Sequence, residues 1–331
     1  MVDDIFPHWR LPAYFQSCLN CPKYCDSNKR KFKSVANSPS GIAMLLDWAT
    51  KQSILSTELH VVMEATGIYH EQAAITLHDA GVTVSIINPA HIKNFARGLG
   101  VQTKTDGVDS LILARYAALL KPRRWMPPPP EARILQGLLA RREAIQQDLQ
   151  REKNRQEKSV VANESTLIQQ SIADSIAFLI EQLKKIQTQI DDHINGNPLL
   201  KHDLALLQSI PAIGEKSSTQ LLAVMHLHTF NSAEQLSAYL GLVPIERQSG
   251  ASLMGVPNYP KQDLQHIRAI LYMAAVVATR YNPHVKALYE RLLARGKTKM
   301  SALGAAMRKL VHLCFGVLKT QQKYQPSYQN A

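Results

Sequence analysis

The stretch that decides the fold is ELHVVMEATGIYH, which runs from Glu58 to His70. Its apolar and mostly β-branched run, Val61 to Met63, is typical of a buried strand and leads directly into Glu64. The sequence Ala65 to Gly67 then interrupts the pattern. An acidic side chain at the end of a buried strand is a common way to place a reactive group at the edge of a sheet, so the rest of the chain is interpreted outward from here.

A second informative stretch, KTDGVDSLILARYAALL, runs from Lys104 to Leu120. Between the two stretches, the pattern predicts a helix from Tyr69 to Ala80 and a strand from Val82 to Asn88. Asp106 and Asp109 lie three residues apart at the start of an apolar-periodic helix, so both carboxylates project from one helical face. The alternation of strands and helices predicts an α/β domain.

Glu64, Asp106 and Asp109 form a candidate metal site. Three carboxylates that meet at one point repel each other unless a cation lies among them, and hard oxygen ligands suit Mg²⁺ or Mn²⁺. Two such ions can hold the attacking and leaving oxygens of a phosphoryl transfer. The alternative is that Asp106 caps its helix, Asp109 is a first-turn acid and Glu64 is a surface residue. Their combination in one α/β unit of a basic chain favours the metal site.

Three segments carry a family resemblance: MEATGIYHE, VSIINPAHIKNFA and TKTDGVDSLILARYAALL. They resemble the DEDD-type transposases of bacterial insertion sequences, a family related to the Piv invertase, and the resemblance extends from Phe32 to Tyr324. It implies an N-terminal RuvC-like domain of the RNase H type and a C-terminal domain with a nucleophilic serine. It also implies a DNA substrate, a bridge RNA as guide, and a homo-oligomer, either a dimer or a tetramer.

One feature of the resembled family is missing. The family places its first metal-binding aspartate in a Gly-Ile-Asp-type strand, which counting back from Glu64 would put near Leu11 to Phe15. That window contains no acidic residue. Asp3 and Asp4 are nearby but lack a β-branched strand context.

The composition predicts a folded protein with an anionic partner. The chain has 331 residues, a formal net charge of +12 and 45% hydrophobic residues. Lys and Arg recur throughout, which favours a nucleic-acid groove over a basic tail that binds membranes. No apolar run of membrane-spanning length and no signal peptide are evident, so we expect a cytoplasmic protein without membrane contact. Cys18, Cys21 and Cys25 form C-x2-C-x3-C without a second ligand pair, which favours reduced thiols over a metal site.

The pattern divides the chain into three parts: residues 1–125, a linker and helical arm at 126–197, and residues 198–331. Four consecutive prolines within Lys121 to Glu131 predict a stiff linker. Two long helices follow between Glu131 and Asn195, and Ile and Leu residues of the second step by threes and fours in a coiled-coil seam. Arg141, Arg142 and Arg155 on the first helix are candidate phosphate contacts, with a solvated helix face as the alternative.

The segment from Leu204 to Met225 resembles a helix-hairpin-helix, in which the turn binds a phosphate. Ala212 stands where such a turn usually has glycine. Gly214 and Lys216 are the candidate phosphate contacts here, and a plain helical hairpin is the alternative. Lys104, in the first part of the chain, is a further candidate contact for nucleic acid.

The last part combines a loop with two apolar helices. The resemblance assigns the nucleophile to Ser249, which precedes Gly250 in a loop after a short predicted strand, LVPIER. Lys261, His266 and Arg268 are candidate contacts for the scissile phosphate. Helices at 266–279 and 300–318 are expected to pack together in a mainly helical domain, and the polar tail from residue 320 is expected to be frayed.

Three functions fit these observations. The leading hypothesis is a transposase or site-specific DNA recombinase in which a metal site positions the phosphodiester and Ser249 attacks it. The second is a catalytically impaired nucleic-acid-binding remnant of such an enzyme, because the first carboxylate is missing. The third is a junction-resolving nuclease of the RuvC type, which leaves the C-terminal part unexplained.

Overall fold

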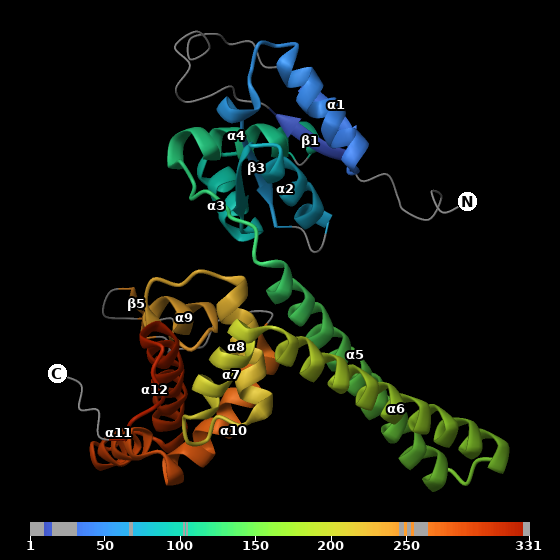
Figure 1. Ribbon diagram of the computed structural model, residues 1–331, viewed down its shortest axis with the longest axis vertical. Helices are drawn as coiled ribbons and strands as arrows, with labels where there is room; N and C mark the ends of the chain where they lie inside the picture. Colours follow the sequence, from blue (N-terminus) through green and yellow to red (C-terminus); the bar gives the residue numbers. More distant parts are fainter. Residues whose placement is uncertain are drawn as a thin grey trace. The chain divides into compact units, whose positions relative to one another are not determined.

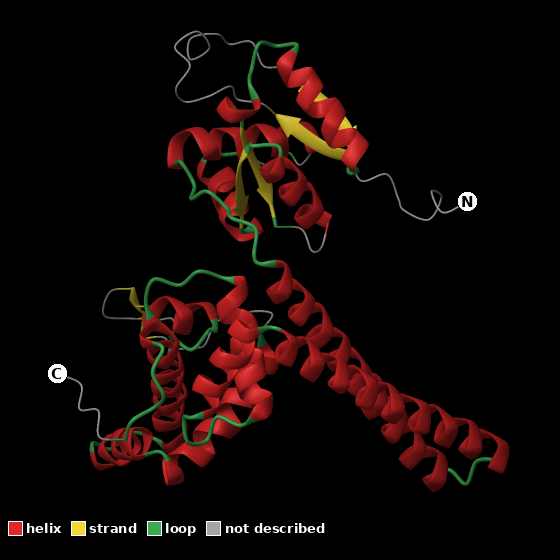
Figure 2. Cartoon of the chain, viewed as in Figure 1, coloured by secondary structure: helices red, strands yellow, loops and turns green. Residues whose placement is uncertain are grey.

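The computed structural model describes residues 10–14, 32–65, 69–101, 103, 105–244, 248–249, 253–254 and 264–326. The chain divides into two compact units, Met1–Pro127 and Pro128–Ala331. Figure 2 shows that helices dominate. The strands among the described residues form short two-stranded pairs. The long helical arm belongs to the second unit.

The parallel strand pair of the first unit is formed by β3 (His60–Glu64) and β4 (Thr83–Ile87). The helix α2 (Tyr69–Asp79) connects the two strands, as Figure 1 shows. Parallel strands require such a crossover because the chain must return from the end of the first strand to the start of the second, which lies at the other end of the pair. The predicted strand–helix–strand order is therefore confirmed. The helix α2 is one residue shorter and β4 two residues shorter than the pattern suggested, whereas β3 also includes His60.

Helices cover both faces of this strand pair, because alternate side chains of a strand point to opposite faces. One face packs against α1 (Pro39–Thr50) and α2. Its buried residues are Met63, Val82, Val84, Ile42, Ala49, Ala73, Ala74 and Leu77. The opposite face packs against α3 (Pro89–Gly98) and α4 (Asp106–Leu120), with a core of Ile87, Ile92 and Ile112.

An antiparallel hairpin precedes α1. Its strands are β1 (Arg10–Tyr14) and β2 (Phe32–Ala36). The side chain of Ser38 accepts a hydrogen bond from the Gly41 nitrogen at 3.1 Å and so caps α1. A Cβ atom at Gly41 would lie 2.1 Å from the Ala36 carbonyl oxygen, so the close approach of α1 to β2 requires glycine here.

The start of the interdomain linker is docked on β4. The Trp125 nitrogen donates to the Val84 carbonyl at 2.7 Å, and the buried Ser85 hydroxyl donates to the Arg123 carbonyl at 2.9 Å. The Trp125 ring packs against the α2 side of the core, edge-on to His78 at 6.3 Å between ring centroids. The stiff part of the linker is therefore limited to the prolines that follow Met126, the last of which opens the next helix.

The arm consists of α5 (Pro130–Val161) and α6 (Thr166–Gly196), which lie side by side (Figure 1). Burial along the predicted seam of α6 decreases with distance from the second unit's core. Ile186, Ile190 and Ile194 are buried at the root, whereas Ile168 near the tip is 46% exposed. Two long helices were predicted, and the structure confirms them, but only the root has the burial of a core.

The rest of the second unit is a bundle around one core. Its helices are α7 (Pro198–Gln208), α8 (Glu215–Leu227), α9 (Ala233–Tyr239), α10 (Gln265–Tyr281), α11 (Pro283–Ala294) and α12 (Lys299–Thr320). The expected packing of the helices near 266–279 and 300–318 is confirmed, because α10 and α12 are in contact. The helix α11 was not predicted from the sequence.

The helix α12 is long and apolar enough to cross a membrane by length and composition, contrary to the expectation that no such run exists. Its buried residues include Leu310, Val311 and Cys314, which belong to the core of the second unit. Burial raises the pKa of the Cys314 thiol to about 12. The apolar character of α12 is explained by its place in this core.

The start of the C-terminal tail is fixed, so the expectation of a frayed tail from residue 320 is wrong for the part that the structure describes. The Tyr324 nitrogen donates to the Ser209 hydroxyl at 2.9 Å, and its hydroxyl lies 2.6 Å from His284 Nδ1. The same hydroxyl donates to Asn282 Oδ1 at 3.2 Å. These contacts hold the tail against the turn between α7 and α8.

The turn between α7 and α8 carries backbone strain at Ala212, which has φ = 80°. This is the left-handed region in which a Cβ atom is unfavourable and glycine is preferred. The neighbouring Pro211 carbonyl accepts a hydrogen bond from the buried Asn282 side chain at 3.4 Å. The turn therefore keeps a glycine-type conformation although alanine occupies the position.

Replacing this alanine with glycine is expected to stabilise the protein. Ala212→Gly removes about 1–2 kcal/mol of left-handed strain and adds about 0.4–1 kcal/mol of unfolded-state entropy, so we expect a gain of about 0.5–1 kcal/mol. Denaturant unfolding of the full chain measures it. The matched control is Ala140→Gly on the exposed side of α5, which should lose about 1 kcal/mol. A loss at both positions would contradict the strain at Ala212.

Candidate functional site

Glu64 is the last residue of β3, and its register partner on β4 is Ile87. Because side chains alternate along a strand, Glu64 shares a face with Val62, and both face the side that α3 and α4 cover. Glu64 is half-buried. The candidate carboxylate therefore lies at the end of the parallel pair, on the face where α4 packs.

The helix α4 begins beside this edge. The Thr105 hydroxyl caps it by accepting a hydrogen bond from the Val108 nitrogen at 3.3 Å, so the cap is not Asp106 as the alternative interpretation had it. Val108 packs against the core of Ile87 and Ile112. Since Asp109 lies one turn before Ile112, it lies on the same side of α4, where it is half-buried.

The structure therefore brings Glu64 and Asp109 to one face of the parallel pair. The backbone of Asp106 opens α4, and its side chain lies outside the described residues, as does that of Lys104. Within the described part of the chain, no group of three or more His, Cys, Asp and Glu side chains is close enough to hold a metal ion. Carboxylate oxygens such as those of Glu64 and Asp109 are of the type that hard cations prefer.

The window that is expected to hold the first carboxylate overlaps a strand. The window from Leu11 to Phe15 overlaps β1 (Arg10–Tyr14), which reads RLPAY and pairs only with β2 among the described strands. The strand context is thus present without an acidic residue. Asp3 and Asp4, and the cysteines at 18, 21 and 25, lie outside the described residues.

A polar pair that sequence reasoning missed lies on the same face as Glu64. His60 Nε2 is 2.9 Å from the hydroxyl of the buried Ser85, which in turn donates to the linker carbonyl of Arg123. Burial lowers the pKa of His60. A neutral His60 can donate from Nε2 to Ser85, so this pair ties the strands to the linker. A histidine in a strand gives no sequence signal for such a role.

In the second unit, Ser249 belongs to a short hairpin of β5 (Gln248–Ser249) and β6 (Leu253–Met254). Its backbone pairs with Leu253, and its side chain lies outside the described residues, as does Lys261. The predicted strand LVPIER does not form over residues 242–244, and residues 245–247 lie outside the described part. The predicted nucleophile is thus carried by a strand pair that the sequence pattern did not indicate.

The candidate phosphate contacts at the start of α8 are exposed to solvent. Gly214 precedes α8 as its N-cap, and Lys216 lies in the first turn, with both exposed. Glu215, between them, adds a negative charge at the same helix end and accepts a hydrogen bond from Gln187 at 3.1 Å. An anion at this helix end must therefore compete with the Glu215 carboxylate.

Arg142 is buried, with 8% of its surface exposed, although it was predicted as a phosphate contact. Its guanidinium donates to Gln187 Oε1 at 2.9 Å, and the Gln187 amide donates to Asp191 and Glu215. Burial lowers the pKa of Arg142, while the nearby carboxylates oppose this shift. Because this guanidinium binds within the root of the arm, we leave Arg142 out of the proposed nucleic-acid surface.

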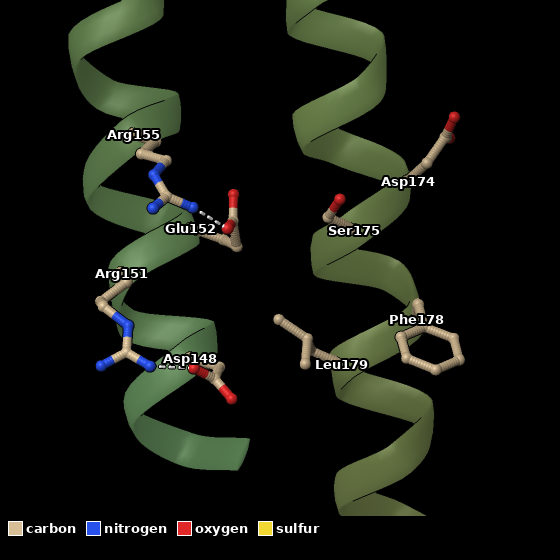
Figure 3. Close-up of a pocket in the computed structure, with 8 residues that line it drawn as sticks. All are labelled: Asp148, Arg151, Glu152, Arg155, Asp174, Ser175, Phe178 and Leu179. Carbon is tan, nitrogen blue, oxygen red and sulfur yellow. Dashed lines mark hydrogen bonds and ion pairs between the residues drawn. The ribbon is translucent and has the colours of Figure 1, made fainter. Parts of the chain in front are cut away.

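Arg155 lies on an exposed part of the arm, at a pocket of about 600 Å³ between α5 and α6 (Figure 3). Its guanidinium pairs with Glu152, and Arg151 pairs with Asp148 on the same helix. These pairs balance the positive charge of this stretch of α5. Arg141, nearer the root, is exposed. The arm is therefore a mixed-charge surface here and not a continuous basic track.

The first turn of α10 holds the remaining candidates. His266 and Arg268 are half-buried, and Arg268 Nη1 is buried without a hydrogen-bond partner among the described residues. An unsatisfied guanidinium nitrogen is costly, so this group is suited to an anionic ligand. Its helix directly follows the segment that contains Ser249.

Two transposase families match the chain. Residues 25–162 match a family described as "Transposase", and residues 204–290 match the "Transposase IS116/IS110/IS902 family". A pilin gene-inverting protein of Moraxella bovis is 33% identical over 291 residues, which cover 87% of this chain and 88% of that protein. The chain belongs to the IS116/IS110/IS902 family of transposases.

Other relatives support the same assignment. The pilin gene-inverting protein of Moraxella lacunata is likewise 33% identical over 291 residues, covering 87% of this chain and 88% of its own length. A protein of insertion element IS110 from Streptomyces coelicolor is 28% identical over 156 residues, 47% of this chain and 37% of that protein. The matched ranges of this transposase include Glu64, Asp106, Asp109 and Ser249, whereas β1 precedes them.

The half-buried His60 is expected to make the stability of the transposase depend on pH. Burial lowers its pKa below the ordinary 6.5, so near and below pH 6.5 the unfolded chain binds the proton more readily. Stability should therefore fall as pH falls from about 6.5 to the lowered value, by at most about 1.4 kcal/mol per pH unit.

The measurement compares thermal unfolding of the full chain and His60→Gln between pH 7.5 and 5.5. The variant should lose this part of the pH dependence, because it carries no titrating ring. The control His91→Gln replaces an exposed histidine of α3 and should keep the wild-type profile. Identical pH dependence in all three proteins would show that His60 contributes nothing.

Proposed function

We propose that the protein is a transposase that cleaves and rejoins DNA through Ser249, at a phosphate positioned by Glu64, Asp106 and Asp109. The observation that carries this proposal is the placement of Glu64 and Asp109 over one face of the parallel pair. This arrangement agrees with an RNase H-type domain of the RuvC kind. Family membership supports DNA as the substrate.

The proposed reaction conserves the energy of the phosphodiester. The Ser249 oxygen attacks phosphorus, a serine–phosphate ester forms, and the bond to one sugar oxygen breaks. The proton leaves the serine and the departing sugar oxygen gains one, so that a free hydroxyl results. A new strand end then attacks the ester by the reverse step and restores Ser249. Glu64, Asp106 and Asp109 would hold Mg²⁺ or Mn²⁺, which stabilises the developing negative charge.

The two groups of residues belong to different units, since the carboxylates lie before Pro127 and Ser249 lies after Pro128. A reaction at one phosphate therefore needs contributions from both units, either of one chain or of two. We propose a homo-oligomer, a dimer or a tetramer, in which such sites assemble on DNA. A guide RNA follows from the family resemblance and the +12 charge agrees with it.

A second candidate is a nucleic-acid-binding protein with impaired chemistry. The specific observation in its favour is β1, which has the expected strand position without an acidic residue. Loss of one anionic ligand leaves less charge compensation around a divalent ion, so metal binding would be weaker. A RuvC-type nuclease, in which water attacks, is the third candidate and leaves the serine-bearing unit without a role.

A covalent adduct tests the proposed chemistry. Labelled DNA carrying the ends of the element, the cognate RNA and Mg²⁺ or Mn²⁺ are incubated with the full chain. Denaturing gels should reveal a protein-linked strand, which Ser249→Ala abolishes and Glu64→Gln reduces by about 100-fold or more.

The matched control is Ser252→Ala, three residues away in the same segment, which should retain the adduct. An adduct that survives Ser249→Ala and disappears with Ser252→Ala would overturn the assignment of the nucleophile. Cleaved ends without any adduct would favour the nuclease, and binding without cleavage would favour the impaired protein.

Binding itself should depend steeply on salt, because positively charged residues displace condensed cations from the nucleic acid. Log affinity for duplex DNA should fall linearly with log salt, with a slope of about 0.9 for each phosphate neutralised. Lys216→Gln at the exposed helix end should lower the slope by about one, whereas Arg142→Gln, at a buried guanidinium, should leave it unchanged. A flat salt titration would remove the electrostatic basis of the proposal.

A further inference from the structure

Three aromatic rings, two from the connection between α8 and α9 and one from the last residue of α9, meet in one place. The ring centroids of His228 and Tyr239 are 4.6 Å apart, and those of Phe230 and Tyr239 are 5.4 Å apart. His228 and Phe230 complete the triangle at 6.1 Å. Among the described residues, this is the one place where three aromatic rings are all in mutual contact. We refer to these three residues as the aromatic cluster.

The aromatic cluster faces solvent on part of its surface. Tyr239 is 36% exposed, His228 is exposed and Phe230 is half-buried. Phe230 also packs against the core of the second unit, and this contact anchors the cluster. Aromatic rings that are held in place and remain partly exposed to water are suited to stacking with another flat ring.

A hydrogen bond helps to hold the cluster in position. The Tyr239 hydroxyl lies 2.7 Å from His228 Nε2. Leu236 and Leu240, on either side of Tyr239 in the chain, are fully buried. The arrangement needs little reorganisation to receive a ligand.

The aromatic cluster directly precedes the segment that bears Ser249. After α9 the chain turns at Gly241, where φ is 67°, and Leu242 is buried in the core. From Tyr239 ten residues lead to Ser249, which limits the separation of their Cα atoms to about 36 Å for a fully extended chain. That length corresponds to about ten nucleotides at the rise of duplex DNA. A phosphate at Ser249 therefore has neighbouring nucleotides within reach of this part of the surface.

We propose that His228, Phe230 and Tyr239 form a stacking platform for an unpaired base of the DNA strand that carries the scissile phosphate. The inference rests on the proposed function and adds a residue set that positions the strand. Strand exchange separates paired bases near the break, and an aromatic surface stabilises a base that has lost its stacking partners. Stacking of one base changes affinity by about tenfold and tolerates any base, because each has a π-face.

The experiment measures binding of fluorescein-labelled 30-nucleotide oligo(dT), oligo(U) and a 30-base-pair duplex to the full chain at fixed salt. Tyr239→Leu should weaken oligo(dT) binding about tenfold and leave duplex binding unchanged. Tyr239→Phe keeps the ring and should bind like the wild type. The matched control is Tyr281→Leu on α10, which removes a tyrosine that is 70% exposed outside the cluster and should have no effect.

A second readout does not depend on the stability of a variant. An oligonucleotide with 2-aminopurine within a dT strand should lose fluorescence on binding the wild-type protein, because the base stacks on a ring. Tyr239→Phe should preserve this quenching, and Tyr239→Leu should reduce it. Thermal unfolding of each variant identifies any variant that fails to fold. If Tyr239→Leu fails to fold, the quenching of 2-aminopurine by the wild-type protein and by Tyr239→Phe tests whether a base stacks on a ring.

Specific results would overturn the inference. Wild-type affinity of Tyr239→Leu for oligo(dT), or unquenched 2-aminopurine in the wild-type complex, would exclude the platform while leaving the proposed function intact. A loss confined to oligo(U) would show that the cluster binds an RNA and would overturn the assignment to the DNA strand. A wild-type protein that binds none of the three nucleic acids would instead refute the proposed function.

Discussion

The packing of α4 on the parallel strand pair is the interaction on which the candidate site depends. Ile112 of α4 and Ile87 of β4 are both buried in one small core, together with Ile92 of α3. This contact fixes the rotation of α4 about its axis, and that rotation directs Asp109 to the face that Glu64 shares. Substituting a small residue at Ile112 would remove buried apolar surface and free α4 to rotate. The geometry of the carboxylates is thus set by apolar packing.

Local sequence patterns were sufficient to predict those elements whose structure depends on neighbouring residues in the chain. The strand from His60 to Glu64 contains an apolar, mostly β-branched run, and the helix from Asp106 contains a long apolar stretch after an acidic first turn, so the existence of both elements could be predicted. The acid–strand–helix combination is also the basis of the candidate site, whose role stays a prediction. The cap of α4 was misassigned, because Thr105 and Asp106 are both favourable cap residues and only the backbone geometry distinguishes them.

Other features depend on contacts between distant segments and could not be predicted. Arg142 looks like a surface charge in a helix pattern, but Gln187 and Glu215 meet it from two other helices. Tyr324 belongs to a polar tail, and its position is set by hydrogen bonds to the turn before α8 and to the α10–α11 junction. Tertiary contacts decide such cases, since a local pattern carries no information about which segment will pack nearby.

The distribution of charge follows from the same contacts. On the arm, Arg151 and Arg155 pair with acids of their own helix, and Arg142 is buried, so this region contributes less to the field around the protein than its composition suggests. Exposed positive charges are instead concentrated where α11 turns into α12. These residues are Arg291, Arg295, Lys297 and Lys299. The net charge of +12 attracts nucleic acid, but burial and pairing reduce the contribution of the arm. The exposed surface near the turn between α11 and α12 is therefore better suited to hold phosphates than the arm.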